Sequence, residues 1–137
     1  MKTAVVFGAR QFFGFEICSQ LLDKGYYVHA IDHPNWQKKD HKDKWLFIGR
    51  NANLKYTNIE EHTDFRQSNI PERPHLYIFP LVDYYSRNDP IVRDQLIIML
   101  EELATTPAPT DSLFIFLQPS AFPMNDSQFS GNIEGLI

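Results

Sequence analysis

Cysteine and long apolar runs are scarce in this sequence. Its 137 residues include a single cysteine, Cys18, so no internal disulfide can form. No stretch approaches the ~20 consecutive apolar residues that span a bilayer. The start of the chain, in which about six apolar residues follow Lys2, is too short for a secretory signal. These absences favour a cytoplasmic protein with no membrane segment.

An excess of positive charge is also lacking. The chain has 13 Lys and Arg against 17 Asp and Glu, a net charge of -4, and no basic stripe recurs along it. The sequence therefore predicts no nucleic-acid partner. The histidines show no metal-ligand spacing, so no metal site is predicted. They are His29, His33, His41, His62 and His75.

The chain does contain 43% hydrophobic residues, arranged in short runs. At this length they suffice for one buried core but not for a second domain. We therefore predict a single domain over residues 1–137. Residues 119–137 are rich in Pro, Ser, Asn and Gly without any period, and we expect a mostly irregular tail there.

The most informative stretch runs from Thr3 to Asp32. A short apolar run ends at Gly8, a helix is expected from about Phe12 to Gly25, and a second apolar run ends at Asp32. Four-residue spacing predicts one buried face on this helix, on which Cys18 packs. That face comprises Phe13, Ile17 and Leu21, with Gly14, Cys18 and Leu22 beside them.

The region after Asp32 is less clear. Residues 33–44 are polar and are expected to form a solvated loop or an exposed helical face. The apolar run 45–48 either closes that helix or forms a strand, and we favour the helix. A short strand is expected at 54–56 and a helical turn or two at 59–65.

The second half of the chain has stronger signals. Asp89 and Pro90 have the residue types of a helix cap and first helical position, and the helix should end before Pro107. Apolar runs at 75–79 and 113–117 predict the fourth and fifth strands. The alternation of strands and helices predicts an α/β, Rossmann-like three-layer fold. Its parallel sheet should have about five strands in the order 3-2-1-4-5.

The chain resembles the amino-terminal half of the extended short-chain dehydrogenase/reductases, the NAD-dependent epimerase/dehydratase group, from Thr3 to about Phe122. The turn from Gly8 to Gly14, Asp32 and the fifth strand carry the resemblance. It implies an NAD or NADP site, with NAD favoured because Asp32 would repel a 2'-phosphate. The residues placed around the cofactor are Gly8, Arg10, Gln11, Phe12, Phe13, Gly14, Asp32, His33, Pro80 and Leu81.

Three departures from the family pattern concern its chemistry. The middle glycine of the turn is replaced, with Gln11 or Phe12 in its place, and residues 80–82 replace small residues. The family's catalytic Tyr-x-x-x-Lys pair is missing, because no Tyr has a Lys four residues later and Lys55 is the last lysine. In addition to these three departures, Ser120 lies one residue late for the family's serine. We therefore predict no catalytic residue.

These observations favour a catalytically incompetent relative, a pseudoenzyme that acts by nucleotide or protein binding, with cofactor affinity weak or absent. One alternative is a reductase-like or epimerase-like enzyme that completes its site with a second subunit or uses Tyr84 as the acid. Another is a cofactor-free scaffold. Tyr84 and Tyr85 either line a pocket or pack against the following helix.

The fifth strand predicts association. It is apolar and contains no Lys or Pro, and an unprotected apolar edge invites pairing. Either residues 119–137 cover it or a second copy docks there. We favour a homodimer formed through this strand or the adjoining helix, residues 90–104.

Overall fold

The computed structural model describes residues 2–33, 39–58, 76–87, 89–105 and 112–118. Five parallel strands form one sheet in the order β3-β2-β1-β4-β5. The expected Rossmann-like α/β class and strand order are thus confirmed. The strands are β1 (Thr3–Phe7), β2 (Tyr27–Asp32), β3 (Leu54–Asn58), β4 (Leu76–Phe79) and β5 (Leu113–Phe116).

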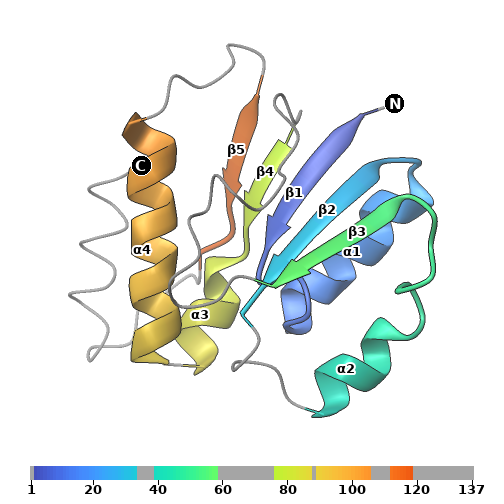
Figure 1. Cartoon of the computed structure of the whole chain (residues 1–137), viewed down its shortest axis with the longest axis horizontal. Coiled ribbons are helices and arrows are strands. Elements are labelled where there is room, and N and C mark those ends of the chain that lie inside the picture. The colour runs from blue at the N-terminus through green and yellow to red at the C-terminus, as the bar shows by residue number, and fades with distance from the viewer. Residues whose placement is uncertain (1, 34–38, 59–75, 88, 106–111, 119–137) are drawn as a thin grey trace.

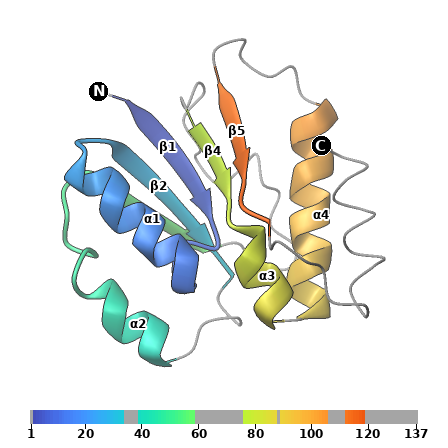
Figure 2. The same cartoon turned by 180° about the vertical axis from the view of Figure 1, so that it is seen from behind.

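Helices cover both faces of this sheet (Figure 1). Those on one face are α1 (Phe12–Asp23) and α2 (Lys39–Trp45), and those on the other are α3 (Leu81–Arg87) and α4 (Pro90–Thr105). Figure 2 shows α1 and α2 from the opposite side. The side chains of β1 alternate between the two faces, so Val6 packs towards α1 while Val5 and Phe7 pack towards α3 and α4. The sheet is therefore the middle layer of three.

Stacked aromatic rings join three strands on the α4 side. The ring of Phe79 lies 4.4 Å from that of Phe7 and 4.9 Å from that of Phe116, centroid to centroid. Tyr77 and Phe114 stack in the same way at 4.7 Å. These side chains meet because parallel strands in register place equivalent residues opposite one another. The rings fix β4 between β1 and β5.

The buried face of α1 differs from the expected one. Gly14, Cys18 and Leu22 are its buried residues, whereas Phe13 is largely exposed, so the prediction that Phe13 is buried was wrong. The helix is rotated because Gly14 is the residue that touches the turn after β1. Cys18 packs as expected, and burial raises the pKa of its thiol.

Other expectations were met in part. The run 45–48 closes α2 at Trp45 and then leaves the helix as a turn. Helix α4 begins as predicted, since the Asp89 carboxylate accepts hydrogen bonds from the amides of Ile91 and Val92 at 3.1 and 3.3 Å. Helix α3 was not predicted. The expected strand residue His75, the helical turn at 59–65 and the tail 119–137 lie outside the described residues.

Candidate functional site at the carboxyl edge of the sheet

The turn between β1 and α1 is built on the close approach of two glycines. Gly8 has a φ of 77°, in the left-handed region. A Cβ atom on Gly14 would lie 2.0 Å from the carbonyl oxygen of Gly8, so no side chain fits at position 14. The first turn of α1 therefore lies directly against the end of β1. The amides of this turn, which have no partner within the helix, lie at the carboxyl edge of the sheet, where open α/β folds bind ligands.

Asp32, at the end of β2, fastens this turn. Its Oδ2 accepts hydrogen bonds from the backbone amide of Arg10 at 2.8 Å and from Nε2 of Gln11 at 3.3 Å, and its Oδ1 accepts one from the His33 amide at 2.7 Å. Burial raises the pKa of the carboxyl to about 6, although these hydrogen bonds oppose the shift. The carboxylate is fully buried and directed into the protein.

Gln11 contributes its side chain to the same cluster. It is one of the two residues, with Phe12, that stand in place of the middle glycine of the family pattern, and its side chain is only 1% exposed. The amide group lies on Asp32 and takes part of the carboxylate's capacity to accept hydrogen bonds. Gln11 thus covers the acid that was expected to hold the ribose.

The structure reveals a second buried acid, Asp83, which sequence reasoning missed. From α3 its carboxylate accepts hydrogen bonds from the amides of Phe13, at 3.1 and 3.2 Å to its two oxygens, and Gly14, at 3.0 Å. Burial raises its pKa to about 6, opposed by these two backbone hydrogen bonds. Asp83 therefore supplies a negative charge to the N-terminus of α1, the part of this fold that attracts anions.

One sequence signal pointed to such a group. The N-cap residue of α1 is Gln11, whose side chain makes no capping hydrogen bond. A buried helix start without a Ser, Thr, Asp or Asn cap needs a partner from elsewhere in the chain. Asp83 meets that need from 70 residues away, a distance at which sequence spacing gives no guidance.

His33 and Tyr84 fill the space beside these acids. His33 Nδ1 lies 2.6 Å from Oε1 of Gln95 and Nε2 lies 3.3 Å from the Tyr84 hydroxyl. Burial lowers the pKa of His33 to about 4, so the ring is neutral near pH 7. Since an amide oxygen only accepts, Nδ1 donates to Gln95 and Nε2 accepts from Tyr84.

Tyr84 is unsuited to the role of an exposed acid. It is fully buried, and burial raises the pKa of its hydroxyl well above the ordinary value, with the charges of Asp32 and Asp83 acting in the same direction. Arg93 donates to the carbonyl oxygens of Tyr84 and Tyr85 at 3.2 Å and holds this helix end in place. Of the two interpretations of these tyrosines, the structure supports packing.

The remaining predicted cofactor residues are scattered around the cluster. Pro80 and Leu81 are buried, and Leu81 lies in the core. The guanidinium of Arg10 packs 3.8 Å from the centroid of the Tyr56 ring and 5.0 Å from that of Trp45. Phe12 lies on the surface at the start of α1. The structure therefore brings together the glycine turn, Gln11, Asp32 and His33, and leaves the other predicted residues at its margins.

The arrangement defines a Rossmann-like α/β domain with a glycine turn at the switch point of its sheet. Among solved structures, the chain is similar to one described as the Pseudomonas aeruginosa RhlG/NADP active-site complex, with a TM-score of 0.56 and 12% sequence identity. The similarity covers 98% of this chain, which spans 62% of that one. No protein-family model and no curated protein matches the chain. At this identity the likeness shows the fold.

Two further findings concern the described residues alone. No three of their His, Cys, Asp and Glu side chains are grouped so that they could hold a metal ion. None of the helices within these ranges is both long and apolar enough to cross a membrane.

Proposed function

We propose that this chain is a non-catalytic Rossmann-like domain that acts by binding a protein, and that its own side chains take the positions of a dinucleotide. One observation carries the proposal: the Asp83 carboxylate is hydrogen-bonded to the amides of Phe13 and Gly14. In dinucleotide-binding domains of this fold the pyrophosphate lies at that helix end. A pyrophosphate there would displace a carboxylate or face its charge.

The ribose position supports the same conclusion. Asp32 already accepts hydrogen bonds from Arg10, Gln11 and His33 and is buried, so it is not offered to a ribose hydroxyl. In this arrangement the residues do not fit NAD or NADP. The proposal therefore includes neither NAD nor NADP as a ligand of the wild-type protein.

The absence of the family's acid/base pair supports the non-catalytic part of the proposal. A positioned acid or base typically contributes about 10²–10⁴-fold to a rate. Within these 137 residues no Tyr is followed by Lys at the fourth position. Tyr84, the substitute that the enzyme hypothesis would require, is buried, and its hydroxyl donates a hydrogen bond to His33.

The second candidate is a dinucleotide-binding domain in which Asp83 and Gln11 move away from the turn. The observation that favours it is the fold shared with a structure described as an NADP complex. This candidate is compatible with the alternative of an enzyme that completes its site with a second subunit.

Thermal unfolding with NAD, NADH, NADP and NADPH separates the two candidates. A ligand at 100 times its Kd stabilises the folded state by about 2.7 kcal/mol, which shifts the Tm of a small domain by several degrees. We expect no shift for the wild-type protein at millimolar ligand. We expect a shift of several degrees for the double variant Gln11→Gly/Asp83→Ala, because both occluding side chains are gone.

Two further variants make this test specific. Asp94→Ala removes an exposed acid from α4 and should behave like the wild type. In the double variant the Gln11 side chain no longer covers the Asp32 carboxylate, so adding Asp32→Ala should abolish the gained binding by removing the ribose partner. A clear shift in the wild-type protein would support the second candidate. A folded double variant that binds no dinucleotide would show that Asp83 and Gln11 do not occlude a site.

A further inference from the structure

Four large apolar side chains lie exposed where the N-terminal end of α1 meets the C-terminal end of α2. Their exposed fractions are 56% for Phe12, 45% for Phe13, 78% for Leu46 and 85% for Phe47. We call these four residues the apolar patch. Exposed apolar side chains that gather at one place mark binding surfaces, whereas isolated ones are ordinary.

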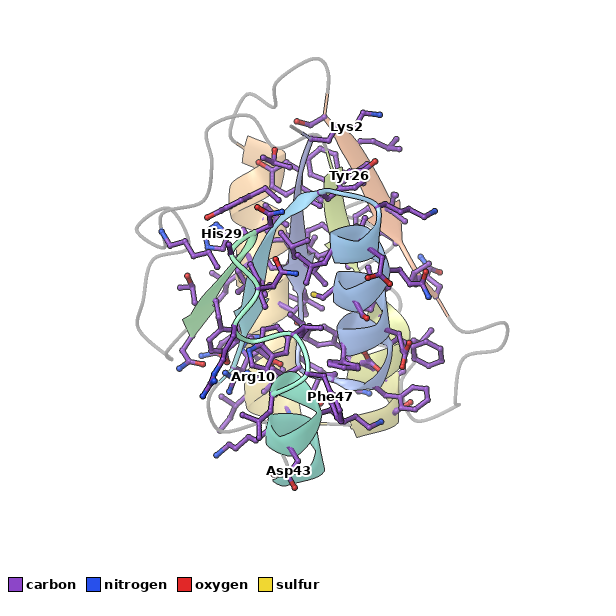
Figure 3. All side chains as sticks on the ribbon, turned by 90° about the vertical axis from the view of Figure 1, so that its right-hand side faces the viewer. Lys2, Arg10, Tyr26, His29, Asp43 and Phe47 are labelled. Atoms are coloured by element: carbon purple, nitrogen blue, oxygen red, sulfur yellow. The ribbon has the colours of Figure 1, made fainter. Side chains whose placement is uncertain are left out.

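Several contacts show that the two pairs belong to one surface. The rings of Phe12 and Phe13 meet edge to face at 5.0 Å, and Nζ of Lys44 lies 5.1 Å from the centroid of the Phe12 ring. The amide of Phe47 donates to the carbonyl oxygen of the same Lys44 at 3.1 Å. Helices α1 and α2 are in contact, and Figure 3 places Phe47 between the upper end of α2 and the lower end of α1.

The patch is held on a fixed support. Trp45 is buried, packs against the Tyr56 ring at 5.4 Å and lies 5.0 Å from the Arg10 guanidinium. The amide of Gly49 donates to the Trp45 carbonyl oxygen at 2.7 Å and closes the turn that follows α2. Leu46 and Phe47 are therefore presented on an anchored turn. A preformed apolar surface of this kind lowers the entropy that binding must overcome.

Positive charge borders the patch in a chain whose net charge is -4. Lys42, Lys44 and Arg50 are exposed on α2 and the turn after it. Asp43 lies among them in the last turn of α2 and its carbonyl oxygen accepts a hydrogen bond from the Leu46 amide at 3.2 Å, but Figure 3 shows its side chain pointing away from α1. The nearest described acid on α1 is Glu16, one helical turn beyond Phe12. The border of the patch therefore favours a negatively charged occupant.

The same charges argue against two other occupants. In a symmetric pair of this chain the patch would meet itself, and its basic residues would face one another. Anionic membranes are typically recognised by clusters of about four to eight Lys and Arg, whereas the described side chains on α2 and the turn after it include three. Aromatic anchors inside a charged border are typical of protein interfaces.

We infer that the apolar patch binds an acidic amphipathic helix of a partner protein, with the apolar face of that helix on Phe12, Phe13, Leu46 and Phe47. The inference rests on the proposed protein-binding function and names its surface. The apolar side chains supply the contact, and Lys42, Lys44 and Arg50 select for Glu and Asp on the sides of the helix.

Fluorescence anisotropy with the full chain and two designed peptides tests the inference. The probe is an 18-residue helix with Leu and Phe at positions i, i+3, i+4 and i+7 and Glu elsewhere, and its partner peptide has Lys in place of every Glu. We expect the Glu peptide to bind at least tenfold more tightly than the Lys peptide, and to lose affinity as salt is raised. Leu46→Ser/Phe47→Ser should weaken its binding at least tenfold.

The matched control is Ile91→Ser, which removes an exposed apolar side chain from α4 and should leave peptide binding unchanged. Circular dichroism checks that each variant is folded. Equal binding of the two peptides, no binding of either, or no effect of Leu46→Ser/Phe47→Ser would overturn the inference. So would tighter binding to phosphatidylcholine/phosphatidylserine vesicles than to the Glu peptide, which would make the patch a membrane surface.

The two proposals fail separately. The wild-type protein could bind no Glu peptide and also show no thermal shift with dinucleotides. That result would contradict the docking surface and leave the proposal of an occluded dinucleotide site standing. A dinucleotide shift in the wild-type protein contradicts the proposed function whatever the peptide does.

Discussion

At the scale of single residues, two buried acids determine the arrangement of the site, and only one of them was predicted from the sequence. Asp32 was expected as a ribose ligand and instead joins β2 to the glycine turn. Asp83 was not expected at all and binds the amides of α1. Both carboxyls have pKa values raised to about 6, because burial outweighs their hydrogen bonds.

The raised pKa of Asp83 predicts how the stability of the protein depends on pH. An acid whose folded pKa exceeds its ordinary value of 3.8 binds protons more tightly when folded, so its stabilising contribution is present below about pH 4 and is lost as pH rises through 6. The contribution of Asp83 to the free energy of unfolding of the wild type should therefore rise as the pH is lowered from 7 to 4. Asp83→Asn should remove that rise of roughly 2 to 3 kcal/mol. Urea unfolding at several pH values measures the difference between the two proteins.

The comparison with the wild type is necessary because other groups act in the opposite direction. The pKa values of His29 and His33 are lowered to about 4 by burial, so their contributions are lost as pH falls from 6.5 towards 4. Those contributions cancel in the difference. Asp94→Asn, at an exposed position on α4, is the control and should follow the wild type. A pH dependence identical in Asp83→Asn and wild type would contradict the raised pKa.

At the scale of elements, the position of α1 against β1 decides where its amides point. That position depends on the contact between Gly14 and Gly8, in which a Cβ atom would come within 2.0 Å of a carbonyl oxygen. The oxygen belongs to the backbone and cannot turn aside. The rotation of α1 and the exposure of Phe13 both follow from this contact.

We therefore predict that Gly14→Ala lowers the free energy of unfolding by at least about 2 kcal/mol, the range of overpacked sites. The matched variant is Gly25→Ala, where φ is 84° but nothing lies within 4 Å of an added Cβ. It should cost only the local strain of a left-handed residue, roughly 1–2 kcal/mol. Chemical denaturation of both variants measures the difference, and a smaller loss for Gly14→Ala than for Gly25→Ala would contradict the close contact.

At the scale of the whole molecule, the exposed edge of β5 is the reason we still predict a homodimer. Within the described residues β5 pairs only with β4, and Leu113 is 57% exposed. The apolar edge that the sequence predicted is only half-buried here. Ile91 and Ile98 are also exposed, seven residues apart on α4. This surface lies on the opposite side of the sheet from the apolar patch.

The prediction is a homodimer that buries β5 or α4. Light scattering at micromolar concentration should give twice the mass of the chain, and Leu113→Lys or Ile98→Lys should return it to the monomer mass. Phe47→Ser should leave the dimer intact, because the apolar patch is not part of this surface. A monomer mass for the wild-type protein would contradict the hypothesis.

The sequence by itself determined the class of fold and the order of its strands. The apolar run Ala4–Phe7, which ends at Gly8, indicates a buried strand, and Asp89 with Pro90 marks a helix start, because these signals depend on neighbours in the chain. Right-handed crossovers then leave few arrangements for a parallel sheet. The sequence also predicted a cofactor site that includes Gln11, Asp32 and His33, and the structure places these three residues together beside the glycine turn.

Only the tertiary structure decided what these residues do there. The Asp83 carboxylate reaches the amides of Phe13 and Gly14 across 70 and 69 residues of chain, and the Gln11 side chain turns inward onto Asp32. No local pattern specifies such contacts, since they depend on how far α1 rotates about Gly14 and on where α3 leaves β4. The same fold can present its helix amides to an anion from solution or to its own carboxylate, and the packing of these two helices selects the carboxylate here.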